Sequence, residues 1–345
     1  MSEINPTSAS RAKALPLAIC VPVRNEAAVL PQLFAAVERL ERTGIAPRLC
    51  LLLDSCDDAS LALVRDHAAN ASMPVIVEEV AASDANAGRA RHRAMMLGDR
   101  SLDGDGVLLT TDADSIPSRD WLQAMVAGLR QADVVAGKVV RTVTQSNPLL
   151  DRLEAYYDAL HALRRSLDPV DWEGKPAHHY ASGANLGLRV ASYRSLGGFQ
   201  PLANGEDGRL VDDAARAGLR VRRDATCVVH TSDRRLGRVA HGLAGTLRTL
   251  DRDGEAIDVA DPRDAAWQYR GHGVARLAFA KADFASLAVA VGLTIDHLVG
   301  VARDCPNAES FAMRVVPTPP GGMRRVSLGI AEVELAAIPA GRRAA

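Results

Sequence analysis

Two carboxylates stand directly after an apolar run in the first half of the sequence. The tetrapeptide Thr111-Asp112-Ala113-Asp114 follows Val107-Leu108-Leu109. In extended backbone, residues two apart point the same way, so Asp112 and Asp114 can face one ligand together. Hard oxygen ligands at this spacing suit Mg²⁺ or Mn²⁺ bound to a diphosphate. An exposed turn is the simpler interpretation of an Asp-x-Asp sequence, so the surrounding residues must decide between the two.

The elements that must position these carboxylates alternate between two hydrophobic periods. Strand-length apolar runs precede segments with helical spacing: 17–21 before 26–42, 49–53 before 58–69, 74–77 before 87–97, and 107–109 before a helix over 120–130. Continuously apolar strands that alternate with amphipathic helices predict an α/β fold with a mostly parallel sheet covered on both faces. Ligands on such sheets bind outside the carboxyl ends of the strands.

The polar clusters of this half all fall at predicted strand ends. Arg24-Asn25-Glu26 follows the first strand, Asp54-Ser55 follows the second, and Asp112 with Asp114 follows the fourth. Because the carboxyl ends of parallel strands meet at one edge of the sheet, these clusters are expected to share one site. The shared position of these polar clusters favours a functional role for Asp112 and Asp114 over a simple exposed turn.

Length and composition are those of a globular enzyme. The chain has 345 residues, of which 48% are hydrophobic and 24% charged, so it is long enough to bury a large core. With 41 basic and 42 acidic residues, the net charge gives no reason to expect nucleic acid or an anionic membrane as the main partner. The five cysteines show no CxxC spacing, which favours reduced thiols in a cytoplasmic protein.

Neither end of the chain shows a clear membrane or export signal. The segment 1–13 is polar and lacks an apolar h-region, so no secretory signal is predicted. The most apolar stretch, 284–302, is interrupted by Asp296 and His297 and is rich in alanine and glycine. A packed helix is therefore expected there, and no integral membrane span.

Six motifs occur in one order between residues 17 and 235. They are Val21-Pro22-Val23-Arg24-Asn25-Glu26, Leu53-Asp54-Ser55-Cys56-Asp57-Asp58, Gly88-Arg89-Ala90-Arg91, Thr111-Asp112-Ala113-Asp114, Gly197-Gly198-Phe199 and Gly205-Glu206-Asp207. Together they resemble the family 2 glycosyltransferases of the GT-A fold. The resemblance implies a nucleotide-diphospho-sugar donor, a Mn²⁺ or Mg²⁺ cofactor, and transfer of the sugar to an acceptor hydroxyl with inversion at the anomeric carbon.

The resemblance also implies donor-binding residues. Pro22 and Asp54 match positions that line the nucleoside site. Arg24 and Glu26 lie in the loop that follows Pro22, and Ser55 replaces a second acidic residue after Asp54. The helix that opens at Gly88-Arg89-Ala90-Arg91 offers backbone N–H groups and a guanidinium to a diphosphate. Two arginines two apart diverge on a helix, so we expect Arg89 to face the ligand and Arg91 to be solvated.

Metal ligands and the catalytic base are implied in the same way. Asp114 resembles the direct metal ligand and Asp112 a carboxylate on the ribose or metal side, with His230 as a third candidate contact. Asp207 is the expected base, with Glu206 orienting the acceptor or the base. A simpler alternative is that Glu206 and Asp207 only stabilise a helix N-terminus, by less than ~1 kcal/mol.

The expected organisation has three parts. Residues 1–14 are expected to be a disordered N-terminus, and 15–240 a GT-A catalytic domain with a nucleotide-sugar-binding half (15–140) and an acceptor half (141–240). Residues 241–345 are expected to be a helical C-terminal extension with a disordered tail, which leaves a homodimer open. The acceptor is expected to be a small soluble or lipid-linked hydroxyl compound.

Two other functions remain open at this point. A nucleotidyltransferase uses a related sheet and Mg²⁺, but usually carries a glycine- and lysine-rich loop after the first strand, which this sequence lacks. A non-catalytic nucleotide-sugar-binding or docking protein would release no free nucleoside diphosphate. The product therefore separates the three alternatives.

Overall fold

The structure is a computed structural model that describes residues 14–81, 86–142, 147–232, 257–316, 318–319 and 322–339. Of the segment 1–14 predicted to be disordered, residues 1–13 lie outside the described residues, as does the predicted disordered tail, 340–345. The strands are β1 (Leu15–Val23), β2 (Ile45–Asp54), β3 (Val75–Val80), β4 (Val107–Thr110), β5 (Ser115–Pro117), β6 (Val134–Thr142), β7 (Leu186–Arg189), β8 (Val221–Ser232), β9 (Asp258–Ala260) and β10 (Arg325–Ser327). The helices are α1 (Leu30–Glu38), α2 (Ser60–Asn70), α3 (Ala87–Ser101), α4 (Trp121–Leu129), α5 (Pro148–Leu167), α6 (Val190–Ser195), α7 (Glu206–Arg216), α9 (Pro262–Lys281), α10 (Ala285–Val291), α11 (Ile295–Asp304), α12 (Ala308–Val315) and α13 (Leu328–Ala337).

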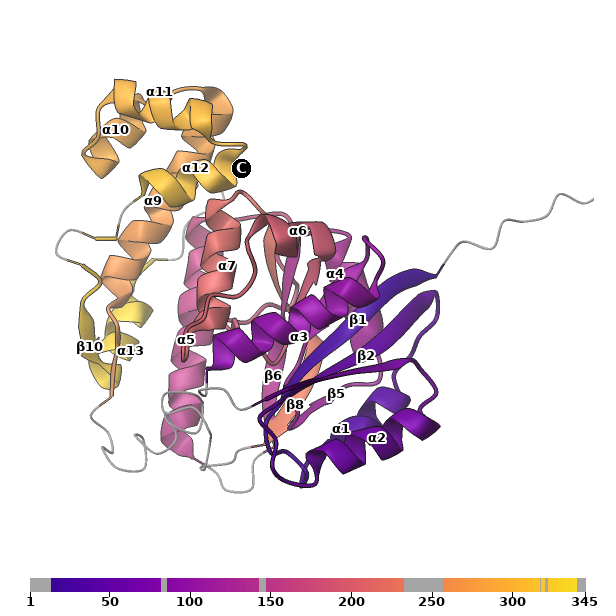
Figure 1. The fold of residues 1–345 in the computed structure, drawn as a ribbon. Coiled ribbons are helices and arrows are strands. Elements are labelled where there is room, and N and C mark those ends of the chain that lie inside the picture. Colours follow the sequence, from indigo (N-terminus) through magenta and orange to yellow (C-terminus); the bar gives the residue numbers. More distant parts are fainter. Residues whose placement is uncertain are drawn as a thin grey trace, which may run out of the picture.

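One eight-stranded sheet forms the centre of the molecule, in the order β3-β2-β1-β4-β7-β6-β8-β5 (Figure 1). β1 pairs in parallel with β2 and β4, β2 with β3, and β6 with β8. β7 runs antiparallel to β4 and β6, and β5 runs antiparallel to β8. The mostly parallel sheet predicted from the alternating apolar runs is confirmed.

Alternation along β1 shows why its sequence is continuously apolar. Leu17, Ile19 and Val21 belong to a core cluster with α1, α2 and α4, whereas Ala18 and Cys20 belong to a second cluster with α3, α6 and α7. Both sets are completely buried, because each face of the sheet is covered by helices. A strand buried on both faces exposes no polar positions, as the sequence pattern indicated.

Two predicted helices differ from the structure. The first begins at Leu30, near Pro31 in its first turn, and not at Glu26. The apolar stretch 284–302 is two helices: α10 ends at Gly292, which has a φ of 69°, and the Thr294 side chain accepts a hydrogen bond from His297 N at the start of α11. Glycine allows this left-handed conformation, so the chain turns where a single helix was expected.

No single helix in the described part of the chain is both long and apolar enough to cross a membrane. α10 and α11 reach that length and hydropathy only as a pair, with their axes bent by 103°.

The C-terminal helices pack against the sheet domain through α5 and α7 (Figure 1). At the end of α7, Asn307 Nδ2 donates to the carbonyl of Gly218 and Ser310 Oγ donates to that of Arg216, each at 2.7 Å. These bonds satisfy carbonyls that a helix C-terminus leaves without partners. The predicted helical C-terminal region is confirmed, and the boundaries at 140 and 240 stay predictions.

Candidate active site

The two aspartates lie in a hydrogen-bonded turn between β4 and β5. Ser115 N donates to the carbonyl of Asp112 at 3.1 Å, so the backbone is not extended there as the two-residue spacing assumed. The turn is not a simple solvent-exposed one, because Asp112 and Asp114 are only partly exposed and Ala113 between them is buried. Other elements of the site hold each of the two carboxylates.

Arg91 of α3 is the buried centre of the site. Its Nη1 donates to Asp112 Oδ1 at 2.8 Å, to Thr110 Oγ1 at 3.1 Å and to the Gly183 carbonyl at 2.8 Å. Its Nε donates to Glu206 Oε1 at 3.2 Å. The side chain is only 9% exposed. Burial favours loss of the proton, but the carboxylates of Asp112 and Glu206 outweigh it and raise the pKa of Arg91, so it stays charged.

The expectation that Arg91 would be the solvated arginine of its pair is wrong. Arg89 is the exposed one, at the start of α3, where its backbone N–H donates to the capping side chain of Asn86. Gly88, Arg91, Met95 and Gly98 are all buried and lie at helical spacing along one face of α3. That spacing was the sequence signal for a buried Arg91. A contact between Arg89 and the diphosphate stays a prediction.

Glu206 and Asp207 open α7 beside this arginine. Glu206 is buried against Arg91, while Asp207 is partly exposed. The two oxygens of Asp207 accept hydrogen bonds from different backbone N–H groups: Oδ2 from Gly183 at 3.0 Å and Oδ1 from Gly208 at 2.7 Å. The segment before β7 therefore touches both the arginine and the carboxylate expected to be the base.

Gly183 is held in place by a buried polar network. The neighbouring Asn185 accepts from Trp121 Nε1 at 2.8 Å and donates to the carbonyls of Lys138 and Cys227 at 2.9 and 3.0 Å. A β-carbon at Gly183 would lie 2.3 Å from Arg91 Nε, so only glycine lets the chain approach the guanidinium this closely. The Ser182-to-Gly187 segment thus positions Arg91, and sequence reasoning gave it no such role.

The expected nucleoside residues lie at the ends of β1 and β2. Pro22 is paired with Leu52 in the sheet, and Arg24 Nη1 lies 3.5 Å from Asp54 Oδ2. Glu26 N donates to Ser60 Oγ at 2.9 Å, which joins the loop after β1 to the start of α2. The structure brings these residues to the same sheet edge as Asp112, as predicted, and their contacts with a nucleotide stay predictions.

Asp114 is approached from β8. Thr231 Oγ1 lies 3.5 Å from Asp114 Oδ1, within a strand that pairs with β5. His230 precedes Thr231, and successive side chains of a strand point to opposite faces, so the face that reaches Asp114 is that of Thr231. Across the described ranges, no three His, Cys, Asp or Glu side chains form a metal-binding group. A metal contact from His230 stays a prediction.

Comparison with known proteins identifies the family. The family model described as glycosyl transferase family 2 matches residues 18–196. The chain belongs to glycosyl transferase family 2. A search of curated proteins found no match.

Two solved structures show the same GT-A fold as this family 2 glycosyltransferase. S. aureus TarS 1–349 in complex with UDP-GlcNAc has a TM-score of 0.50 and 14% identity, over 86% of this chain and 90% of that one. GalNAc-T7 with UDP, GalNAc and Mn²⁺ has a TM-score of 0.51 and 16% identity, over 89% of this chain and 59% of that one. The prediction of a GT-A glycosyltransferase is thereby confirmed.

Proposed function

We propose that this glycosyltransferase inverts the anomeric carbon of the donor sugar and that Asp207 is its base. The observation that carries the proposal is the Arg91 guanidinium, which contacts Asp112 on one side and Glu206 on the other. It joins the donor motif and the acceptor motif into one site. An inverting transfer needs a single base that takes the acceptor proton on the face opposite the leaving diphosphate.

The surroundings of Asp207 fit that role. Its two oxygens accept from the Gly183 and Gly208 N–H groups, which fixes the plane of the carboxylate. A carboxylate offers about four acceptor positions, so it can still accept the proton of an acceptor hydroxyl. Glu206 is buried and its Oε1 accepts from Arg91 Nε, so we assign it to positioning that arginine and not to the role of base.

The donor set at the β4–β5 turn fits a divalent cation. Asp112 and Asp114 supply hard carboxylate oxygens, and Mg²⁺ commonly binds through one or two carboxylates together with substrate phosphates and water. When bound, Mn²⁺ or Mg²⁺ would offset the negative charge of the leaving diphosphate. Asp114 is the proposed direct ligand, and Arg91 orients Asp112 beside it. His230 stays the candidate for a third contact.

The nucleoside is proposed to lie over Pro22, Glu26 and Asp54. Arg24 fixes the Asp54 carboxylate so that it can accept from a nucleobase N–H, and Arg89 is the proposed contact of the diphosphate. GalNAc-T7 was solved with UDP and TarS with UDP-GlcNAc, which makes UDP-sugars the first donors to test. We retain a small soluble or lipid-linked acceptor, a cytoplasmic location and a homodimer as proposals.

Donor binding and donor hydrolysis test the proposal without knowledge of the acceptor, because water can take the sugar slowly. A panel of UDP-, GDP-, dTDP- and CDP-sugars is tested by thermal shift with Mn²⁺ and with EDTA, followed by measurement of nucleoside diphosphate release. Asp114→Ala should lose the Mn²⁺-dependent stabilisation, which arises because a ligand that binds only the folded state stabilises it by mass action. Asp207→Asn should bind the donor normally and release nucleoside diphosphate at least about 100-fold more slowly.

Asp120→Ala is the matched control, because Asp120 is an exposed aspartate after the same turn whose side chain makes no capping hydrogen bond. It should behave like the wild-type protein. Normal hydrolysis by Asp207→Asn would show that another group is the base. Unchanged Mn²⁺-linked binding by Asp114→Ala would remove the metal assignment.

A further inference from the structure

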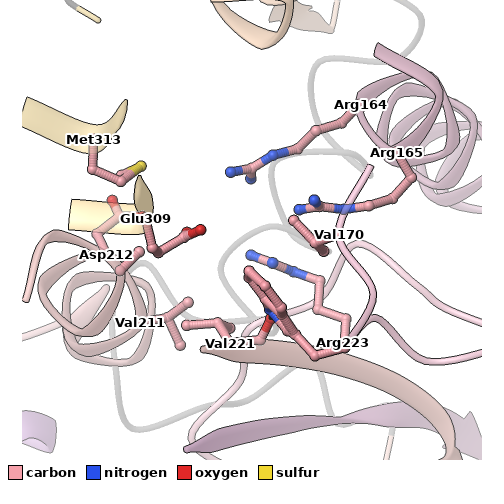
Figure 2. A pocket seen from close by; sticks show the side chains of 11 residues that line it. Arg164, Arg165, Val170, Val211, Asp212, Val221, Arg223, Glu309 and Met313 are labelled. Atoms are coloured by element: carbon pink, nitrogen blue, oxygen red, sulfur yellow. The ribbon is translucent and has the colours of Figure 1, made fainter. Parts of the chain in front are cut away.

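A second polar recess lies between the sheet domain and the C-terminal helices. Its free space, open solvent included, is roughly 350 Å³, and it is lined by Arg164, Arg165, Val170, Trp172, Val211, Asp212, Ala215, Val221, Arg223, Glu309 and Met313. Figure 2 shows Arg164 and Arg165 of α5 and Arg223 of β8 pointing into it from one side. Glu309 of α12 and Asp212 of α7 lie on the other side. The recess is therefore strongly positive on one wall.

The acidic groups nearest these arginines are already paired. Arg276 binds Asp168 through Nη1 at 2.7 and 2.9 Å and also binds Glu309 at 2.5 Å. Arg165 pairs with Glu173 at 2.6 Å. Asp168 and Glu173 each have a direct ion pair with an arginine other than Arg164 and Arg223.

Arg164 and Arg223 form no direct ion pair of this kind within the described residues. Within the described residues, neither guanidinium forms an ion pair or a hydrogen bond, and the Nε of each is buried without a partner. The guanidinium of Arg164 lies over the Tyr269 ring, 5.4 Å from its centroid. Both residues are partly buried, and charges that are removed from water in proteins are normally paired.

Neighbouring ionisable groups respond to the same positive field. Burial, with the nearby Arg164 acting in the same direction, lowers the pKa of Arg223 to about 10, although the carboxylates of Glu173 and Asp212 oppose the change. Burial lowers the pKa of His272 to about 3, with Arg164, Arg276 and Arg165 acting in the same direction. At neutral pH the arginines stay charged and this histidine stays neutral, so the wall keeps a positive charge that a bound anion would offset.

We propose that this recess binds the phosphate group of a small hydroxylated molecule. Arg164 and Arg223 donate to the phosphate oxygens, since the planar guanidinium fork matches phosphate geometry, and Arg165 adds a third positive charge. The opposite carboxylates, Asp212 and Glu309, face the hydroxyl groups of the ligand. Val170, Val211, Val221 and Met313 supply the apolar part of the lining.

The recess is distinct from the site at the sheet edge. Arg223 lies near the start of β8, whereas Thr231, which reaches Asp114, lies near its end. β8 bulges between them, and the paired strand β6 covers the same stretch in five residues, from Ala136 opposite Arg223 to Arg141 opposite Thr231, or roughly 17 Å at the usual rise. The anion site therefore does not hold the donor diphosphate, and the inference does not depend on the proposed base or metal. It spans α7 and α12, so a bound phosphate would tie the C-terminal helices to the helix that begins with Glu206.

Calorimetric titration of the full chain with inorganic phosphate tests the site. The experiment is run in EDTA at constant ionic strength, so that neither the donor metal nor general screening contributes. We expect saturable binding by the wild-type protein and at least a ten-fold loss of affinity in Arg164→Gln and in Arg223→Gln. Arg152→Gln is the matched control: Arg152 lies on the same helix, outside the recess, paired with Glu332 at 2.6 Å. It should bind phosphate like the wild type.

Further ligands and variants locate the site. Asp114→Ala should bind phosphate normally, whereas loss of binding there would place the anion in the donor site and overturn the proposal. Unchanged binding by Arg164→Gln would also overturn the proposal; the substitution is at a solvent-accessible position, so the variant should still fold. The absence of saturable binding by the wild type would overturn it as well.

Glycerol 3-phosphate should bind more tightly than inorganic phosphate. Binding only to vesicles that contain phosphatidic acid would overturn the assignment to a small molecule.

Discussion

Arg91 Nη1 donates a 2.8 Å hydrogen bond to Asp112 Oδ1 from the buried face of α3. The same guanidinium reaches Glu206 through Nε, so one side chain joins the carboxylates of two distant motifs. Removing it would leave Glu206 as a buried carboxylate without its cation, and such unpaired buried charges are strongly destabilising. The geometry of the donor side and that of the acceptor side therefore depend on one residue.

Arg91→Met should unfold about 3 kcal/mol more easily than the wild type and lose donor hydrolysis, because it leaves Asp112 unoriented and Glu206 unpaired. Urea unfolding and nucleoside diphosphate release measure the two effects. Arg89→Met is the matched control on the exposed face of the same helix, and its stability should stay within about 0.5 kcal/mol of the wild type. Equal stability of the two variants would contradict the role of Arg91.

Gly183→Ala should reduce activity by displacing the Arg91 guanidinium. An added β-carbon would lie 2.3 Å from Nε and 2.4 Å from Cζ of that side chain, so the guanidinium must shift from the position in which it contacts Asp112. Gly300→Ala is the control, since it adds the same methyl group in α11 with nothing within 4 Å and should stabilise the helix by about 0.5–1 kcal/mol. If Gly183→Ala hydrolyses the donor at the wild-type rate, the close approach of Gly183 to the Arg91 guanidinium is not needed for activity.

The positions of the strand-end carboxylates could be predicted because they depend on short-range patterns. Apolar runs place Asp54 and Asp112 at strand ends, and parallel strands bring those ends to one edge. The contacts that fix these side chains come from residues far away in the chain. Gly183 and Thr231 reach the site only through the register of β7 and β8, which no local pattern specifies.

The wrong prediction for Arg91 has a different physical reason. A charged residue on a helix is normally solvated, so Arg91 was assigned to water although it shares a buried face with Met95 and Gly98. Its partners, Asp112 and Glu206, come from other elements, and only the folded chain shows that they neutralise it. The recess beside Arg164 and Arg223 escaped prediction because it needs α5, β8 and α12 together.

Trp121→Phe should destabilise the protein by about 1–3 kcal/mol while keeping most of the packing. The indole Nε1 donates to Asn185 Oδ1 at 2.8 Å in the completely buried network before β7, and phenylalanine would leave that oxygen unsatisfied. Trp267→Phe is the matched control on α9, where the residue is only partly buried. Thermal or urea unfolding compares the two. A smaller loss of unfolding free energy for Trp121→Phe than for Trp267→Phe would show that the hydrogen bond to Asn185 does not stabilise the protein.

The stability of the protein should fall as the pH is lowered from about 6.5 to about 4, in part through His178. This histidine is buried, its Nε2 lies 3.0 Å from the Ala136 carbonyl, and its Nδ1 accepts from Tyr180 N, so the ring is held neutral with the proton on Nε2. Burial, partly opposed by the bond to Ala136, lowers the pKa of His178 to about 4. The unfolded chain titrates near 6.5, so between these values it binds more protons than the folded one.

His178 therefore contributes fully to stability above pH 6.5, and its contribution is lost on the way to pH 4 by about 3 kcal/mol. His178→Gln keeps an amide donor for the Ala136 carbonyl but cannot titrate. Between pH 7 and pH 4, its free energy of unfolding should therefore fall by about 3 kcal/mol less than that of the wild type. His297→Gln, at an exposed position of α11, should follow the wild-type curve. Parallel curves for His178→Gln and the wild type, measured by urea unfolding at each pH, would show that His178 does not set this dependence.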